Sequence, residues 1–237
     1  MKKKLLLLTI AVLCLATWAS ADSFVFFGSR AAQNPTDIID WGQLGNLGGS
    51  VSTPQPVSTF NGNPAVVGNT NGGGFVPSQE GFNWFGGFDY GESLVWTGNS
   101  NFGIGGGGPF AIVLANPVGS FGFNIEADLI APFTVTVAAL DSSGNPLLTY
   151  TFNGIYGCGF GNGCVSFTGV GDTTGGNIAE ILISTNSPSD PLFANDFAIN
   201  DPSFTYGAVV TPEPSSLLLM GTGLLGLAGV IRRKMAC

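Results

Sequence analysis

Residues 121–152, FGFNIEADLIAPFTVTVAALDSSGNPLLTYTF, decide the fold of this chain of 237 residues. Apolar and polar side chains alternate over residues 121–128, and residues 133–139 repeat the alternation. A period of two places one set of side chains on each face of a strand. The turn residues of 141–146 then lead into a further alternating segment, 148–152. The stretch therefore predicts an antiparallel β-meander.

Further short strands are predicted on both sides of this meander, each bounded by Gly, Asn, Pro or Ser. They cover residues 23–27, 93–97, 110–114, 165–170, 178–184 and 196–206. About ten short strands without helical periodicity predict an all-β fold, a single β-sandwich of jelly-roll type. Residues 42–77 are rich in Gly, Asn, Ser, Thr and Pro, which predicts a long loop system or a partly ordered segment.

The first 21 residues have the three parts of a secretory signal peptide. Lys2 to Lys4 are basic, residues 5–18 are apolar, and Ala19-Ser20-Ala21 is a small-residue cleavage site. The secretion machinery is therefore an expected partner. Cleavage after Ala21 leaves residues 22–210 as the predicted exported domain.

The last 27 residues combine a rigid motif, an apolar run and a basic end. Residues 211–214 are Thr-Pro-Glu-Pro, residues 215–231 form a predicted transmembrane helix, and Arg232, Arg233 and Lys234 form a basic stop. A helix of this length measures about 25 Å, near the short limit for a hydrocarbon core of about 30 Å. The positive-inside rule keeps the basic stop in the cytoplasm and the exported domain outside the inner membrane.

This tail, residues 211–237, resembles the C-terminal sorting tail of PEP-CTERM proteins, which are exported by bacteria that make extracellular polysaccharide. The resemblance implies a precursor anchored in the inner membrane, processing by an exosortase-like enzyme, and delivery to the cell surface or extracellular matrix. Pro212, Glu213 and Pro214 are then the sorting motif, followed by the basic stop. A permanent tail anchor without processing is the alternative.

Two further segments resemble parts of some PEP-CTERM exoproteins. Residues 37–45, DIIDWGQLG, resemble an early D-x-x-D-W-G-Q-L-G segment, and residues 195–201, NDFAIND, resemble the final strand of their jelly-roll domains. In carbohydrate-binding modules with this fold, a comparable final-strand Asp often helps to hold a structural Ca²⁺. The resemblance makes Asp196, Asn200 and Asp201 candidate Ca²⁺ ligands, with a turn-forming role at the strand ends as the alternative.

The charge distribution argues against several functions. Between residues 22 and 211, Arg30 is the single basic residue against 14 carboxylates, a net formal charge of −13, so binding to nucleic acid or to an anionic membrane face is not expected. The chain has no histidine, and the exported segment has no lysine, which removes Ser–His, Cys–His, Ser–Lys and Schiff-base chemistry.

No catalytic residue is therefore expected. A carboxylate pair of glycosidase type is the remaining enzymatic option, with Glu126 and Asp128 or Glu80 and Glu92 as the pairs to consider.

Cys158 and Cys164 are the two cysteines of the exported segment, six positions apart in a glycine-rich stretch. In an oxidising compartment this spacing favours a disulfide that closes one loop, because two thiolates alone lack the ligands for a metal site.

An aromatic-dense run offers a binding surface. Trp84, Phe85, Tyr90 and Trp96 are the candidate residues of a sugar-stacking platform, and nearby glycines let a flat ligand approach the backbone. The leading prediction is thus a protein that binds extracellular polysaccharide without catalysis. A purely structural matrix or envelope protein without a defined ligand, in which such rings are core residues, is the alternative. An ice-binding role needs a repeating flat array, and the pair Thr134 and Thr136 is too short for one.

Overall fold

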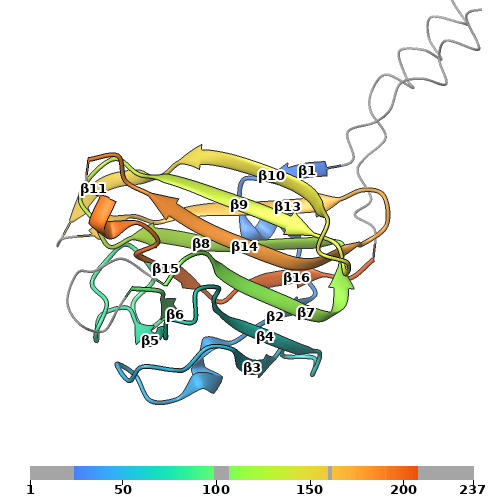
Figure 1. The fold of residues 1–237 in the computed structure, drawn as a ribbon, viewed down its shortest axis with the longest axis horizontal. Helices are drawn as coiled ribbons and strands as arrows, with labels where there is room; N and C mark the ends of the chain where they lie inside the picture. The colour runs from blue at the N-terminus through green and yellow to red at the C-terminus, as the bar shows by residue number, and fades with distance from the viewer. Residues whose placement is uncertain (1–23, 99–106, 160–161, 190, 208–237) are drawn as a thin grey trace, which may run out of the picture.

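The computed structural model describes residues 24–98, 107–159, 162–189 and 191–207 (Figure 1). Within these ranges the chain forms two large antiparallel sheets and a short hairpin, so the all-β prediction is confirmed. The eight-stranded sheet consists of β1 (Phe24–Phe27), β13 (Ser166–Asp172), β8 (Ser120–Ala127), β15 (Phe197–Asn200), β6 (Ser93–Trp96) and β5 (Val76–Gln79). β16 (Ser203–Thr205) also pairs with β8, and β2 (Asp37–Ile38) pairs with β16.

The second sheet has six strands. In spatial order these are β10 (Pro146–Asn153), β9 (Thr134–Leu140), β14 (Ile178–Asn186), β7 (Phe110–Val118), β4 (Pro64–Asn69) and β3 (Gln55–Ser58). The remaining elements are the hairpin β11 (Ile155–Gly159) and β12 (Asn162–Cys164), the helix α2 (Arg30–Gln33), and the 3-10 helices η1 (Trp41–Leu44) and η2 (Pro191–Phe193).

The predicted signal peptide, residues 1–21, and the predicted tail, residues 211–237, lie outside the described residues. Across the described ranges, no helix has the length and apolar character needed to cross a membrane.

The hydrophobic core lies between the inner faces of the two sheets. β8 contributes Phe121, Phe123 and Ile125, while β9 contributes Val135 and Val137, and all five side chains are fully buried. These are the alternating residues that predicted strands, so the pattern correctly identified which side chains face inward.

The predicted meander is wrong in one respect. β9 and β10 form an antiparallel hairpin around the turn at 141–146, as expected, but β8 pairs with β13, β15 and β16 in the other sheet. Residues 128–133 therefore carry the chain from one sheet to the other. Alternation marks the inner face of a strand but not its partner, since both sheets turn an apolar face to the same core.

Two other predictions need correction. Residues 42–77 are not a loop system, because they contain most of η1, the hairpin of β3 and β4, and the start of β5. The segment 196–206 is two strands, β15 and β16. Pro202 separates them, and its carbonyl accepts a hydrogen bond from Ile39 N at 2.9 Å, outside the ladder.

The segment DIIDWGQLG has a structural role. Asp40 caps η1 by accepting a hydrogen bond from Gly42 N, and Trp41 is buried against Phe110. The side-chain amide of Gln43 bonds both backbone groups of Ser58, donating to its carbonyl and accepting from its N–H, each at 2.9 Å. Gln43 thus occupies the outer edge of β3 as another strand would.

Candidate functional site

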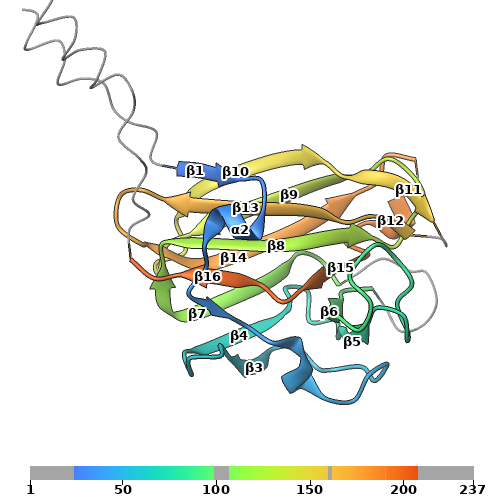
Figure 2. The same ribbon diagram turned by 180° about the vertical axis from the view of Figure 1, so that it is seen from behind.

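The connection from β5 to β6, residues 80–92, lies over the outer face of the eight-stranded sheet; we call it the aromatic loop. Trp84 and Phe88 of this loop are buried against Leu94 of β6 and Ala198 of β15, with Trp96 packed beside them. Figure 2 shows the connection next to β15 and β6. The loop and the sheet therefore form a small second core outside the sandwich.

The aromatic loop also presents rings to solvent. Phe82 is 64% exposed, Phe85 is 54% exposed and Tyr90 is 89% exposed. Gly81 has φ of +79°, and a Cβ there would lie 2.3 Å from Cε2 of Tyr90, so the Tyr90 ring rests directly against the Gly81 backbone. Three rings on one short loop make a surface on which a flat apolar ligand face can stack.

Carboxylates hold the loop in place. Both carboxylate oxygens of Glu80 accept hydrogen bonds from Gly86 N, at 3.0 and 3.1 Å, within the loop. From the sheet below, Oε2 of Glu126 accepts from Nε1 of Trp84 at 3.2 Å and from Gly87 N at 3.0 Å. The loop is therefore fastened to β8 through a single carboxyl group.

The carboxyl groups beneath the loop favour their neutral forms. Burial raises the pKa of Glu126 to about 7, against its hydrogen bonds from Gly87 and Trp84, and the nearby Glu80 and Asp128 raise it further. Burial likewise raises the pKa of Glu80 and of Asp128. Asp196 lies opposite Asp128, whose backbone N–H donates to the Asp196 carbonyl, and burial raises the pKa of Asp196 to about 7.

The structure divides the four predicted platform residues. Phe85 and Tyr90 are exposed as a platform requires, whereas Trp84 is only 4% exposed and Trp96 is partly buried against it, with ring centroids 6.3 Å apart. Trp84 as a surface-stacking residue is thus a wrong prediction, because its indole N–H is directed to Glu126. Phe82 was missed; its position next to Gly81 was the available signal.

The three candidate Ca²⁺ ligands face different partners. Oδ1 of Asp196 accepts from Nε1 of Trp96 at 2.6 Å, and Oδ1 of Asp201 accepts from Trp41 N at 2.8 Å. Asn200 accepts from Asn124 N and donates to Glu92. In the ranges that the structure covers, no group of three or more Asp, Glu, Cys or His side chains is arranged to hold a metal ion. Ca²⁺ binding stays a prediction.

The other predicted groups have structural surroundings. Glu80 and Glu126 accept backbone or indole N–H groups, as described above, and a catalytic role for either carboxylate pair is untested. Cys164 is 4% exposed on β12 and is disulfide-bonded. The side chain of Cys158 lies outside the described residues, so its pairing with Cys164 stays a prediction.

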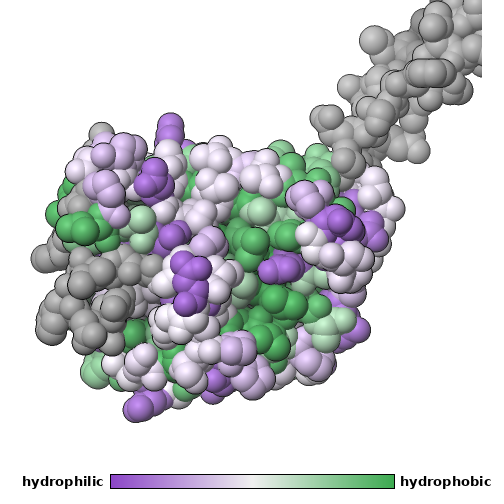
Figure 3. Space-filling view, in the orientation of Figure 1, coloured by the Kyte–Doolittle hydropathy of each residue, from purple (hydrophilic) through white to green (hydrophobic). Residues whose placement is uncertain are grey.

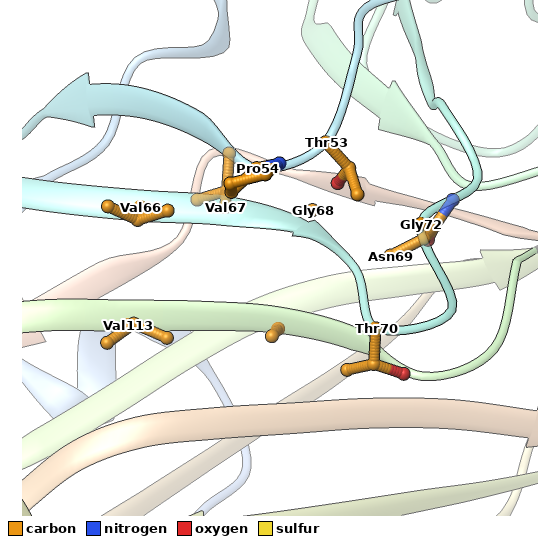
Figure 4. A pocket seen from close by; sticks show the side chains of 10 residues that line it. Thr53, Pro54, Val66, Val67, Gly68, Asn69, Thr70, Gly72 and Val113 are labelled. Atoms are coloured by element: carbon orange, nitrogen blue, oxygen red, sulfur yellow. The ribbon is translucent and has the colours of Figure 1, made fainter.

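The outer face of the six-stranded sheet is different in character. Figure 3 shows apolar side chains gathered over the middle of this face. Val66 and Val113, each 40% exposed, lie next to each other on β4 and β7, and the neighbouring pair Gly68 and Ala111 leaves a hollow beside them (Figure 4). The hollow has a volume of about 320 Å³. Thr53 closes one side, and its Oγ1 approaches the Gly68 backbone.

Threonines line another part of this face. Thr134 and Thr136 lie on β9, and Thr149 and Thr151 form a second pair on β10 that the sequence interpretation overlooked. The hydroxyl oxygens of Thr136 and Thr151 are 3.1 Å apart. The ice-binding alternative remains untested.

The fold and the loop together define a class, an all-β protein with an exposed aromatic surface. The C-terminal tail identifies the sorting signal that this protein carries. Residues 210–234 match the model of the PEP-CTERM protein-sorting motif, which confirms the prediction of an exosortase substrate. The motif indicates an exported protein that is first anchored in the membrane and is then sorted to the surface by exosortase. A search of curated proteins gave no sequence match.

Two solved structures are similar in part. One is a DUF4465 family protein from Bacteroides caccae ATCC 43185, with 10% identity and a TM-score of 0.41, covering 72% of this chain and 100% of that chain. The other is the enzymatically active domain of tailspike protein 4 from bacteriophage CBA120, with 14% identity and a TM-score of 0.31, covering 69% of this chain and 20% of that chain. At these scores neither likeness bears on function.

Proposed function

We propose that this exported protein binds extracellular polysaccharide through the aromatic loop and catalyses no reaction on it. The observation that carries the proposal is the exposure of Phe82, Phe85 and Tyr90 on one loop whose other rings are buried. A loop fixed to the sheet loses little further entropy when a ligand stacks on it, which favours binding. The cell surface or the extracellular matrix is the proposed site of action, on a β-sandwich of jelly-roll type.

The charge of the exported segment favours one class of polysaccharide over another. A net formal charge of −13 repels a polyanion, so a neutral polysaccharide is the better partner than one rich in uronic acids. The faces of pyranose rings are apolar, and they match exposed aromatic rings that carry no nearby basic group.

The test compares two loop rings with a ring elsewhere. The mature protein, purified from its host, is run in affinity electrophoresis through gels that contain the host's own extracellular polysaccharide. The double variant Phe85→Ala, Tyr90→Ala is expected to lose affinity about fivefold or more, because each stacked ring contributes about 0.5–1.5 kcal/mol.

Phe60→Ala is the matched control. Phe60 is 82% exposed at the turn between β3 and β4, away from the aromatic loop, and its removal should leave the affinity unchanged. Equal retardation of the double variant and the control would overturn the proposal. Absence of any retardation of the natural protein would do the same and would favour a purely structural matrix protein.

A further inference from the structure

One buried acid lies at the contact between the aromatic loop and β8, beside the apolar packing of the loop on the sheet and the hydrogen bond from Asn200 to Glu92. The Glu126 side chain is fully buried, and both of its hydrogen bonds, from Trp84 and from Gly87, come from the loop to the same oxygen, Oε2. The other oxygen, Oε1, has no hydrogen-bond partner among the described residues. A buried carboxylate with one unsatisfied oxygen is costly when ionised.

The loop backbone lies directly on this carboxyl group. A Cβ on Gly86 would lie 2.1 Å from Oε2 of Glu126 and 2.6 Å from Oε1, so any side chain at this position would displace the carboxyl group. Any change in the charge of Glu126 therefore acts at the surface where the loop meets β8.

The acidic groups that face Glu126 make its ionisation less favourable. Glu80 faces it from the loop and Asp128 from the residue after the end of β8, while Asp196, just before β15, faces Asp128. Ala198, the cross-strand partner of Glu126 on β15, is uncharged, and so is Trp96, the partner of Ala198 on β6. Arg30, the one basic residue of the described ranges, donates to the Asp201 carbonyl at 2.6 Å. No counter-ion from these residues offsets the negative charges that gather between loop and sheet.

We propose that Glu126 is a positioning residue that links the aromatic loop to pH: the loop is docked while Glu126 holds a proton and loosens when Glu126 and Glu80 both carry charge. Repulsion between Glu80 on the loop and Glu126 on the sheet then pushes the two surfaces apart. Since burial raises the pKa of Glu126 to about 7, the change falls near neutral pH. Loosening scatters the exposed rings, so the proposed polysaccharide binding weakens in alkali; this last step rests on the proposed function.

Tryptophan fluorescence tests the link without any ligand. Trp84 donates to Glu126, so its emission reports the ionisation directly. Titration of the full mature protein from about pH 5 to about pH 9 is expected to show a transition near pH 7. E126Q keeps an acceptor oxygen but cannot ionise, and it should remove the part of the transition that Trp84 reports. D196N should remove the part that Trp96 reports, because Asp196 accepts from Nε1 of Trp96 and burial raises its pKa to about 7 as well. E180Q is the control, since Glu180 lies on β14 in the other sheet and should leave the transition intact.

Polysaccharide affinity in the same pH range separates the two proposals. The natural protein is expected to bind on the order of tenfold more weakly at the alkaline end, whereas E126Q binds equally throughout. A fluorescence transition without any polysaccharide binding would contradict the proposed function and leave the pH link supported. Binding that does not vary with pH, or a natural protein whose fluorescence shows no transition, would overturn the link. Where E126Q does not fold, the titration of D196N stands as the test, because the transition that remains in that variant is the one that Trp84 reports.

Discussion

The outer faces of the two sheets differ in how their side chains are covered. Over the eight-stranded sheet, the aromatic loop covers outward-facing residues, and carboxyl groups such as Glu126 are buried beneath it. On the six-stranded sheet, Val66 and Val113 stay partly exposed around a hollow that no charged side chain among the described residues lines. The comparison teaches that the covering loop, and not the strand pattern, is what buries Glu126. Stability and binding should therefore respond to changes under the loop far more than to changes in the hollow.

Removing the ring under the loop should have the largest effect on this comparison. Trp84→Ala is expected to lower the free energy of unfolding by about 3–5 kcal/mol, because it empties a packed site and deprives Glu126 of a hydrogen bond. Denaturant titration followed by circular dichroism measures the change.

The matched substitution on the other face is Val113→Ala, with an expected loss below about 1 kcal/mol because Val113 is 40% exposed. A similar loss for both variants would show that the two outer faces contribute alike and would remove the contrast.

The free energy of unfolding should also depend on pH, with a smaller effect than that of Trp84→Ala. The folded-state pKa of Glu126 is raised from 4.5 to about 7, so the folded state holds a proton that the unfolded state releases. The stabilisation from this proton is complete below about pH 4.5 and is lost as the pH rises through about 7, amounting to about 2 kcal/mol after allowance for solvent screening. Thermal unfolding at several pH values measures it.

E126Q should remove this share of the pH dependence and E180Q should keep it. Asp196 and Asp201 act in the same direction, because burial raises the pKa of each to about 7. Unchanged pH dependence in E126Q would mean that Glu126 carries no proton in the folded state.

Filling the hollow should have the smallest effect. Ala111→Val adds two methyl groups beside Val66 and Val113 at a partly exposed strand position, and the free energy of unfolding should change by no more than about 0.5 kcal/mol. Polysaccharide affinity should not change, as affinity electrophoresis would record. Lost affinity in this variant would place a ligand contact on the six-stranded sheet and reverse the assignment of the binding face.

Much of the fold follows from the sequence where strands are long. Alternation correctly located β9, which buries every second side chain, and the segments 110–114, 165–170 and 178–184, predicted from their bounding turn residues, correspond to β7, β13 and β14. The prediction for residues 42–77 was wrong because their short strands are held by tertiary contacts, which the composition of the segment does not reveal. Gln43 pairing with the backbone of Ser58 is one such contact, and it joins residues 15 positions apart.

The candidate site was only half predictable. The aromatic-dense run marked the loop that carries the exposed rings, yet the run alone does not say which rings turn inward. Trp84 is buried because Glu126, 42 positions away, accepts its indole N–H, and Gly86 lets the loop come that close. Such a choice depends on tertiary contacts, so Phe82 could be distinguished from Trp84 only with the structure.

Arg30 determines where a protease of trypsin type can cut the exported segment. It is the single residue between positions 22 and 211 after which a protease of trypsin type can cut, and the bond it offers, Arg30–Ala31, lies inside α2. Its guanidinium is held by the Asp201 carbonyl from the far end of the chain. A secreted protease of trypsin type therefore has a single bond to attack in the exported segment, and because that bond lies within a hydrogen-bonded turn, we expect slow cleavage of the folded protein.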